Sequence, residues 1–291
     1  MKTEMIRVYG IVQGVGFRPF VSREASELGL CGTVANKGSY VEIHAQGSEK
    51  AVEDLKKALE NRPPERSVIM EIISAHADEP PFDSFEIIDS EKEKGDIFVS
   101  PDIAVCEKCK GELFDKTNRR YLHPFINCTQ CGPRLTIMDS MPYDRVRTTM
   151  ADFPMCKDCE DEYTDPATRR YDAQPVCCNK CGPEVYIIGS GEKGSKAITA
   201  ARKAVMAGKI IAVKGIGGFH LCCDAKNEST VKRLRKLKNR PAKPLAVMLK
   251  DISAARRECD FGEVQEKLLT GWQKPIVLLD KKTSGSLCES V

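Results

Sequence analysis

The sequence lacks a long apolar run and an excess of either charge. No apolar stretch approaches the roughly 18–20 residues that a membrane-spanning helix needs, and the first ten residues contain no apolar core of the signal-peptide kind. The chain has 45 Lys+Arg against 42 Asp+Glu, a net charge of +3. This balance gives no global reason to expect a nucleic acid or a membrane surface as the partner. We therefore expect a cytoplasmic protein with no membrane partner.

Cysteine is the residue type in excess, with 14 in 291 residues. In a secreted chain so many cysteines would indicate disulfides, whereas in a reducing compartment they favour metal sites. The length is sufficient for two domains or three small ones.

The first 90 residues alternate between strand and helix patterns in the order βαββαβ. This order is that of a ferredoxin-like domain, which we assign to residues 1–91. Its expected elements are strands at 4–12, 67–77 and 82–90, a hairpin at 31–46, and helices at 17–28 and 48–61.

A glycine-rich turn, "QGVGFR", separates the first strand from the first helix. Such a turn can point successive backbone N–H groups at one position and form an anion cradle. Arg18 falls in the first helical turn, where the helix dipole disfavours a cation, so its position is best explained if it binds an anion there. The alternative is a glycine-rich corner with a solvated arginine.

Residues 1–90 resemble the acylphosphatases, through "VYGIVQGVGFR" and through the asparagine of "GTVANKGSYVEI". The resemblance implies that Arg18 binds phosphate and that Asn36 orients the attacking water. We predict that both side chains lie at a solvent-open anion site. An alternative for Asn36 is a turn residue in the Asn-Lys-Gly corner. The implied phosphate-binding residues are Gln13, Gly14, Val15, Gly16, Phe17 and Arg18.

Four C-x-x-C pairs follow a charged linker at 90–96 and repeat at an offset of 50 residues, together with the flanking "RRY" and "CGP". Two such pairs complete a tetrahedral four-cysteine zinc site with no open position, which is a structural rather than a catalytic site. We assign residues 100–186 to two zinc fingers (106–131 and 156–181). The duplication favours pairing within each repeat, but interleaved pairing uses the same eight ligands and remains possible. Cys177 could take the place of Cys178 if the register of the pair shifts by one residue. The predicted ligands of two structural Zn²⁺ ions are Cys106, Cys109, Cys128, Cys131, Cys156, Cys159, Cys178 and Cys181.

Residues 194–291 form an α/β pattern that ends without a stop signal, as in an incomplete domain. We expect helices at 196–209 and 227–238, a strand-like segment at 210–223, and short buried strands at 245–250 and 275–280. Seven basic and no acidic residues lie within 231–243. This run is either a solvated helix face with Val231 and Leu234 inward or a nucleic-acid surface, and the missing aromatic platform argues against the latter.

The third segment resembles the YrdC-like nucleotide-binding domains, which implies nucleotide binding by Lys214, Lys238 and Arg240. In this order the three segments resemble the N-terminal part of the HypF carbamoyltransferases of [NiFe]-hydrogenase maturation. The resemblance implies that carbamoyl phosphate is hydrolysed at Arg18 and Asn36. The carbamate is then adenylated with ATP and Mg²⁺, and the carbamoyl group passes to the C-terminal cysteine of a HypE-type partner protein to become a cyanide ligand.

Two features depart from this family pattern. A downstream Ser/Asn nucleotide motif and a transfer domain are missing from the 291 residues, and Asp172 replaces a histidine that usually follows the "RR-aromatic" run. The alternative function is a zinc-finger protein that binds nucleic acid through the basic helix at 231–243. We predict an α+β multidomain carbamoyltransferase fragment, with a ferredoxin-like domain, duplicated four-cysteine fingers and a truncated α/β YrdC-like domain.

Overall fold

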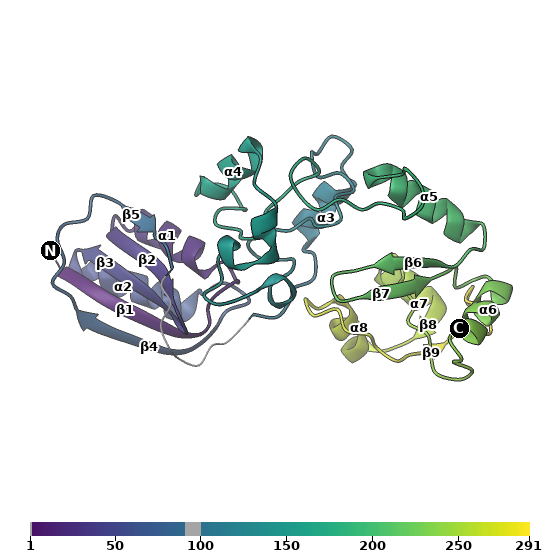
Figure 1. Ribbon diagram of the computed structural model, residues 1–291. Coiled ribbons are helices and arrows are strands. Elements are labelled where there is room, and N and C mark those ends of the chain that lie inside the picture. Colours follow the sequence, from purple (N-terminus) through teal and green to yellow (C-terminus); the bar gives the residue numbers. More distant parts are fainter. Residues whose placement is uncertain (1, 91–99) are drawn as a thin grey trace. The chain divides into compact units, whose positions relative to one another are not determined.

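The computed structural model describes residues 2–90 and 100–291, so most of the linker expected at 90–96 lies outside the described residues. The chain forms two compact units, Met1–Pro183 and Glu184–Val291 (Figure 1). None of the helices in the described parts is long and apolar enough to cross a lipid bilayer.

The first unit opens with a five-stranded sheet in the order β4-β1-β3-β2-β5 (Figure 1). Strand β1 pairs antiparallel with both β3 and β4, while β5 runs parallel to β2. With its two helices this is the ferredoxin-like arrangement, as predicted. The strands are β1 (Lys2–Ile11), β2 (Cys31–Lys37), β3 (Tyr40–Gly47), β4 (Val68–His76) and β5 (Phe85–Ile87), and the helices are α1 (Phe17–Glu27) and α2 (Glu49–Asn61).

Alternating apolar residues form the core of this domain. Ile6 and Val8 on β1 are fully buried and pair with Ile43 and Val41 on β3, so one face of the sheet is apolar. Helix α2 adds Leu55 and begins after Ser48, whose hydroxyl accepts a hydrogen bond from the N–H of Ala51 at 3.1 Å.

The four-cysteine segment belongs to the same unit and has little apolar core of its own. Its elements are the helices α3 (Glu107–Phe114) and α4 (Lys157–Thr164) and the 3₁₀ turns η1 (Leu135–Ile137), η2 (Arg145–Arg147) and η3 (Thr149–Asp152). Each α-helix begins directly after the first cysteine of a pair. The buried clusters are small and contain the cysteines themselves, so apolar packing alone gives this segment little stability.

The second unit contains two separate two-stranded sheets and four helices within the described residues. The predicted strands at 245–250 and 275–280 are wrong. Met248 and Ile276 are 98% and 85% exposed, so these runs are not buried. Apart from Asp280, no residue of either run pairs as a strand, because no described strand lies alongside to exchange backbone hydrogen bonds with it. The elements are α5 (Gly194–Met206), β6 (Ile211–Lys214), β7 (Phe219–Cys222), α6 (Glu228–Leu237), α7 (Ile252–Glu258), β8 (Cys259–Asp260), α8 (Glu263–Thr270) and β9 (Asp280–Lys281).

Candidate active site and metal centres

The turn between β1 and α1 has the conformation that its glycines permit. Gly14 and Gly16 adopt φ values of 72° and 79°, in the left-handed region that other residues rarely enter. Helix α1 begins at Phe17, and no side chain of the described residues caps its first turn. The first N–H groups of a helix have no intrahelical partner, so this end of α1 is suited to an anion.

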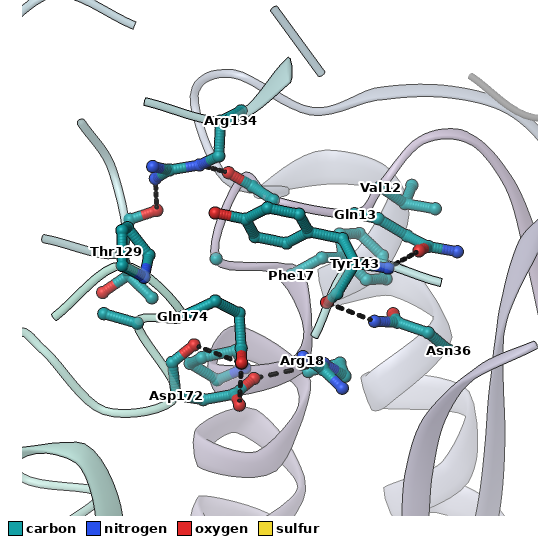
Figure 2. A pocket seen from close by; sticks show the side chains of 15 residues that line it. Val12, Gln13, Phe17, Arg18, Asn36, Thr129, Arg134, Tyr143, Asp172 and Gln174 are labelled. Carbon is teal, nitrogen blue, oxygen red and sulfur yellow. Dashed lines mark hydrogen bonds and ion pairs between the residues drawn. The ribbon is translucent and has the colours of Figure 1, made fainter. Parts of the chain in front are cut away.

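Arg18 is not solvent-open as predicted, since it is only 7% exposed. Its Nη1 donates to Oδ1 of Asp144 at 2.9 Å, and its Nε lies 3.1 Å from Oδ2 of Asp172. Nη1 also donates to the hydroxyl of Ser90 at 3.0 Å. Both carboxylates come from the four-cysteine segment, which folds over the acylphosphatase-like domain and excludes solvent. Figure 2 shows Asp172 approaching the guanidinium.

Asn36 is also buried, with 1% of its surface exposed, and it lies in β2 rather than in the turn that follows. Its side-chain N–H group points to the backbone oxygen of Tyr143 at 3.5 Å (Figure 2). Its Oδ1 is buried, and within the described residues it has no hydrogen-bond partner. A buried amide oxygen normally accepts a hydrogen bond, so this atom is available to a bound water or ligand.

Gln13 and Arg134 attach the four-cysteine segment to the glycine-rich turn. The Gln13 amide donates to the backbone oxygen of Gly38 at 3.1 Å and accepts from the N–H of Tyr143 at 3.3 Å. Arg134 donates to the backbone oxygen of Gly14, and its guanidinium lies 5.9 Å from the centre of the Tyr143 ring. Gln13, Gly14, Arg134 and Tyr143 line one pocket together with Arg18, Asn36 and Asp172.

The residues that the four-cysteine segment places beside Arg18 and Asn36 could not be predicted from the sequence. Asp144 and Tyr143 carry no local signal, because their partners lie more than 100 residues away in the chain. Asp172 is recognisable as a departure from the family pattern, but nothing in the sequence places it beside Arg18.

The eight predicted cysteines form two groups, one from each repeat, and within each group the sulfurs lie within 4.8 Å of one another. The Sγ–Sγ distance is 3.7 Å for Cys128–Cys131 and 3.6 Å for Cys159–Cys181. Four sulfurs at the usual Zn–S distance form a tetrahedron with edges of about 3.8 Å. The donor set and its spacing therefore fit zinc, and the sulfurs group within each repeat.

Cys177 belongs to neither group. Its Sγ lies 3.2 Å from Nε2 of His123, and the other ring nitrogen of this histidine lies 3.0 Å from Oδ1 of Asn179. Burial lowers the pKa of His123 to about 4 and raises the pKa of Cys177 to about 12. A neutral histidine and a protonated thiol therefore fill this position.

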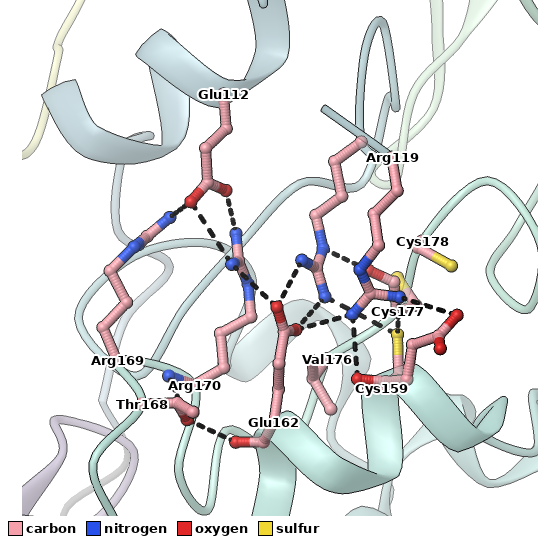
Figure 3. A network of polar contacts seen from close by, with 12 residues as sticks. Glu112, Arg119, Cys159, Glu162, Thr168, Arg169, Arg170, Val176, Cys177 and Cys178 are labelled. Carbon is pink, nitrogen blue, oxygen red and sulfur yellow. Dashed lines mark hydrogen bonds and ion pairs between the residues drawn. The ribbon is translucent and has the colours of Figure 1, made fainter. Parts of the chain in front are cut away.

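Two adjacent arginines of each repeat contact a glutamate of the other repeat (Figure 3). Arg119 and Arg120 of the first repeat lie 2.7 Å and 2.5 Å from Oε2 of Glu162 on α4. In the second repeat Arg169 and Arg170 contact Glu112 on α3 in the same way. The duplication has therefore produced a reciprocal arrangement in which each repeat's arginines bind the other's helix.

The same arginines reach the metal-ligand sulfurs. Arg119 Nη1 lies 3.3 Å from Sγ of Cys159, and Arg169 Nη1 lies 3.2 Å from Sγ of Cys109. A four-thiolate zinc site carries a formal charge of about −2, so these N–H groups offset negative charge at each site. Although burial disfavours the charged form, the arginines keep the pKa of Glu112 and Glu162 below the usual range.

The implied nucleotide-binding residues lie in two places in the second unit. Lys214 ends β6, and its Nζ stands 5.2 Å from the centre of the Phe219 ring. Lys238 caps the C-terminal end of α6, and Arg240 follows in the next loop, where it donates to the backbone oxygen of Pro244 at 2.8 Å. Lys214 therefore lies on a different element from the other two.

The basic helix packs as a surface helix, with Val231 and Leu234 buried as predicted. Arg233 donates to the backbone oxygen of Gly208 at 3.1 Å, and Arg235 to that of Ser290 at 2.6 Å. Lys232 is paired with Glu228 at 3.0 Å. These cations stabilise their own unit, which argues against the alternative of a nucleic-acid-binding helix.

Three family models match the chain in succession. The acylphosphatase model matches residues 4–87, the HypF finger model matches 105–138 and 155–188, and a model described as telomere recombination (Sua5/YciO/YrdC) matches 203–291. These ranges cover nearly all of the described chain.

Curated relatives and solved structures agree with these matches. The chain is 48% identical to carbamoyltransferase HypF2 of Cupriavidus necator over 96% of its length and 46% identical to carbamoyltransferase HypF of Synechocystis over 100%. A crystal structure of full-length HypF in the phosphate- and nucleotide-bound form aligns with a TM-score of 0.91, at 43% identity and over 97% of this chain. The chain spans 35% and 38% of the two curated relatives and 37% of that structure.

Proposed function

Because this chain belongs to the HypF carbamoyltransferase family, of which it matches the N-terminal part, we propose that its first unit hydrolyses carbamoyl phosphate at Arg18 and Asn36. The observation that carries the proposal is the buried Oδ1 of Asn36, which has no partner within the described residues and lines the same pocket as Arg18 and the glycine-rich turn.

Each residue of the pocket has a distinct part in this reaction. The phosphoryl group sits on the N–H groups of the turn that ends at Phe17 and on the guanidinium of Arg18. Asn36 accepts a hydrogen bond from the attacking water, and the backbone oxygen of Tyr143 fixes its amide. The water oxygen bonds to phosphorus as the bond from phosphorus to the acyl oxygen breaks, which gives inorganic phosphate and carbamate. The acyl phosphate is already activated, so positioning and charge stabilisation suffice.

The eight paired cysteines would hold two structural zinc ions, whose bonds replace the apolar core that the segment lacks. By holding Tyr143 and Asp172 in place, the fingers complete the lining of the pocket that Arg18 and Asn36 share.

For the second unit we propose nucleotide binding, with Lys214, Lys238 and Arg240 on the phosphates of ATP and its Mg²⁺. The family match, and the phosphate- and nucleotide-bound form of a related HypF, support this assignment. In the whole protein the carbamate would be adenylated there and the carbamoyl group passed to the C-terminal cysteine of a HypE-type partner.

Hydrolysis in ¹⁸O-labelled water tests the reaction at the first site. If water attacks phosphorus, one ¹⁸O atom appears in the inorganic phosphate released from carbamoyl phosphate, above the background measured without protein. Enzymatic phosphate release without label in the phosphate would show that the carbon–oxygen bond breaks instead, by attack at carbon or by elimination of cyanate, and would remove the role assigned to Asn36.

A further inference from the structure

Asp172 is placed to compete with the substrate for Arg18. Its Oδ2 lies 3.1 Å from Nε of Arg18, and its side chain is only 10% exposed. Arginine binds phosphoryl oxygens most strongly through two parallel N–H groups on different nitrogens. The described carboxylates occupy Nε and Nη1 of Arg18 and leave Nη2, so an incoming phosphate that binds in this two-pronged way must displace at least one carboxylate.

The two carboxylates at Arg18 are not equivalent. Asp144 has a second cation, because its Oδ2 lies 2.9 Å from Nη1 of Arg147. Besides Arg18, Asp172 contacts neutral groups within the described residues, namely the hydroxyl of Tyr163 at 3.2 Å and the amide of Gln174 at 2.7 Å. When Arg18 binds phosphate, Asp144 is still paired with Arg147, whereas Asp172 loses the one cation that it contacts within the described residues.

The duplication supplies an internal comparison. Leu122 lies 50 positions before Asp172, and both adopt the left-handed conformation, with φ values of 52° and 56°. The N–H groups of both donate at 2.9 Å to the backbone oxygen of the residue nine positions earlier. The same loop thus occurs twice, but only the copy beside Arg18 carries a carboxylate.

We propose that Asp172 is a positioning residue that binds Arg18 while the site is free. When a phosphoryl group binds Arg18, Asp172 takes up a proton and releases the guanidinium. This competition makes phosphate binding weaker than it would be with Arg18 alone. This inference rests on the proposed function. The proton comes from solvent, and protonated Asp172 stays hydrogen-bonded to Tyr163 and Gln174.

The charges and hydrogen bonds around Asp172 favour proton uptake when Arg18 leaves it. Arg18 on α1 stabilises its charge, Asp144 opposes it, and Tyr163 on α4 donates to it. Burial raises the pKa of Asp172 above its ordinary value, although Arg18 partly offsets the effect. Loss of Arg18 to a ligand would raise this pKa further.

Titration calorimetry with sulfate on the full chain tests the proposal, because sulfate keeps a fixed charge across the neutral range. We expect Asp172→Asn to bind sulfate about tenfold more tightly than the parent, the size of one competing charged hydrogen bond. Titrations in two buffers of different ionisation enthalpy should show proton uptake by the parent and none by the variant. Leu122→Asn, the matched change in the first repeat, should leave sulfate affinity unchanged.

Kinetics separate competition from a merely structural role. Asp172→Asn should lower KM for carbamoyl phosphate more than it changes kcat, and its melting temperature should stay near that of the parent. Equal or weaker sulfate binding by Asp172→Asn, or no proton uptake by the parent, would overturn the proposal even if hydrolysis persists. If the parent shows neither sulfate binding nor hydrolysis, the proposed function fails as well.

Discussion

Nη1 of Arg169, in the second four-cysteine repeat, lies 3.2 Å from Sγ of Cys109 in the first. The reverse contact, from Arg119 to Cys159, is 3.3 Å. Each set of four sulfurs is therefore stabilised by a cation from the other repeat. The two sites are expected to hold metal as a coupled pair rather than independently.

Replacing Arg119 with Gln should speed zinc loss from the second repeat, although Arg119 itself belongs to the first. The variant removes an N–H donor to Cys159 and the ion pair with Glu162. Loss of such an outer contact typically weakens metal binding about 10- to 100-fold. Zinc release can be followed with a coloured chelator, with Cys→Ser variants of one repeat used to assign the signal.

Lys157→Gln is the matched control for this variant. Lys157 is likewise a cation near a ligand of the second site, because it follows Cys156 in the sequence, but it pairs with the exposed Asp161, at 2.8 Å. Its release rate should equal that of the parent. If Arg119→Gln also equals the parent, the cross-repeat contact has no effect on metal retention.

The purified chain should contain two zinc ions. Metal analysis of protein prepared without added zinc is expected to give a ratio near two, and Cys128→Ser should reduce it to one or less, because the second site loses part of its support. The ferredoxin-like domain has its own buried core and should remain folded in this variant. A metal-free chain with intact finger structure would contradict the zinc assignment.

Arg18→Lys and Asn36→Ala should each lower kcat for acyl-phosphate hydrolysis by about a hundred- to a thousandfold, the usual cost of losing one preorganised group at the reacting centre. Lysine is the better substitution for Arg18, because it leaves a cation beside Asp144 and Asp172 but lacks the planar fork. Steady-state rates and melting curves are compared with those of Arg23→Ala, which changes an exposed arginine of the same helix. Near-parental rates in either site variant would remove its assigned role.

Sulfate affinity should rise as the pH falls. Burial raises the pKa of Asp172 in the free protein. This pKa rises further once Arg18 binds the anion, so the sulfate complex binds more protons than the free protein does. The affinity therefore increases as pH falls through the pKa of the complex and levels off below that of the free protein. Asp172→Asn should show a flat profile over the same range, and a sloping one would assign the proton to another group.

Much of this architecture could be predicted from local sequence signals. The order βαββαβ, the glycine-rich turn before Arg18 and the 50-residue cysteine repeat depend on periodicity, backbone freedom and ligand spacing, which short segments encode. An arginine in a first helical turn, as at position 18, indicates an anion site by its place in the sequence alone. The same helical periodicity places Val231 and Leu234 on the inner face of α6.

The rest depends on contacts between distant residues. Asp144 and Asp172 reach Arg18 across more than 120 positions, so nothing near them in the sequence indicates a buried ion pair. The expectation of an open site was wrong for this reason. The runs at 245–250 and 275–280 have strand-like composition, but a strand forms only where a neighbour offers hydrogen bonds, which composition cannot show.

The most direct test of the account is the release of inorganic phosphate from carbamoyl phosphate by the purified chain. Parent protein and Arg18→Lys are compared at equal zinc content, and spontaneous decomposition is subtracted. The account predicts saturable turnover by the parent and a rate lower by about a hundredfold or more in the variant. Phosphate release by the parent no faster than by Arg18→Lys would contradict it.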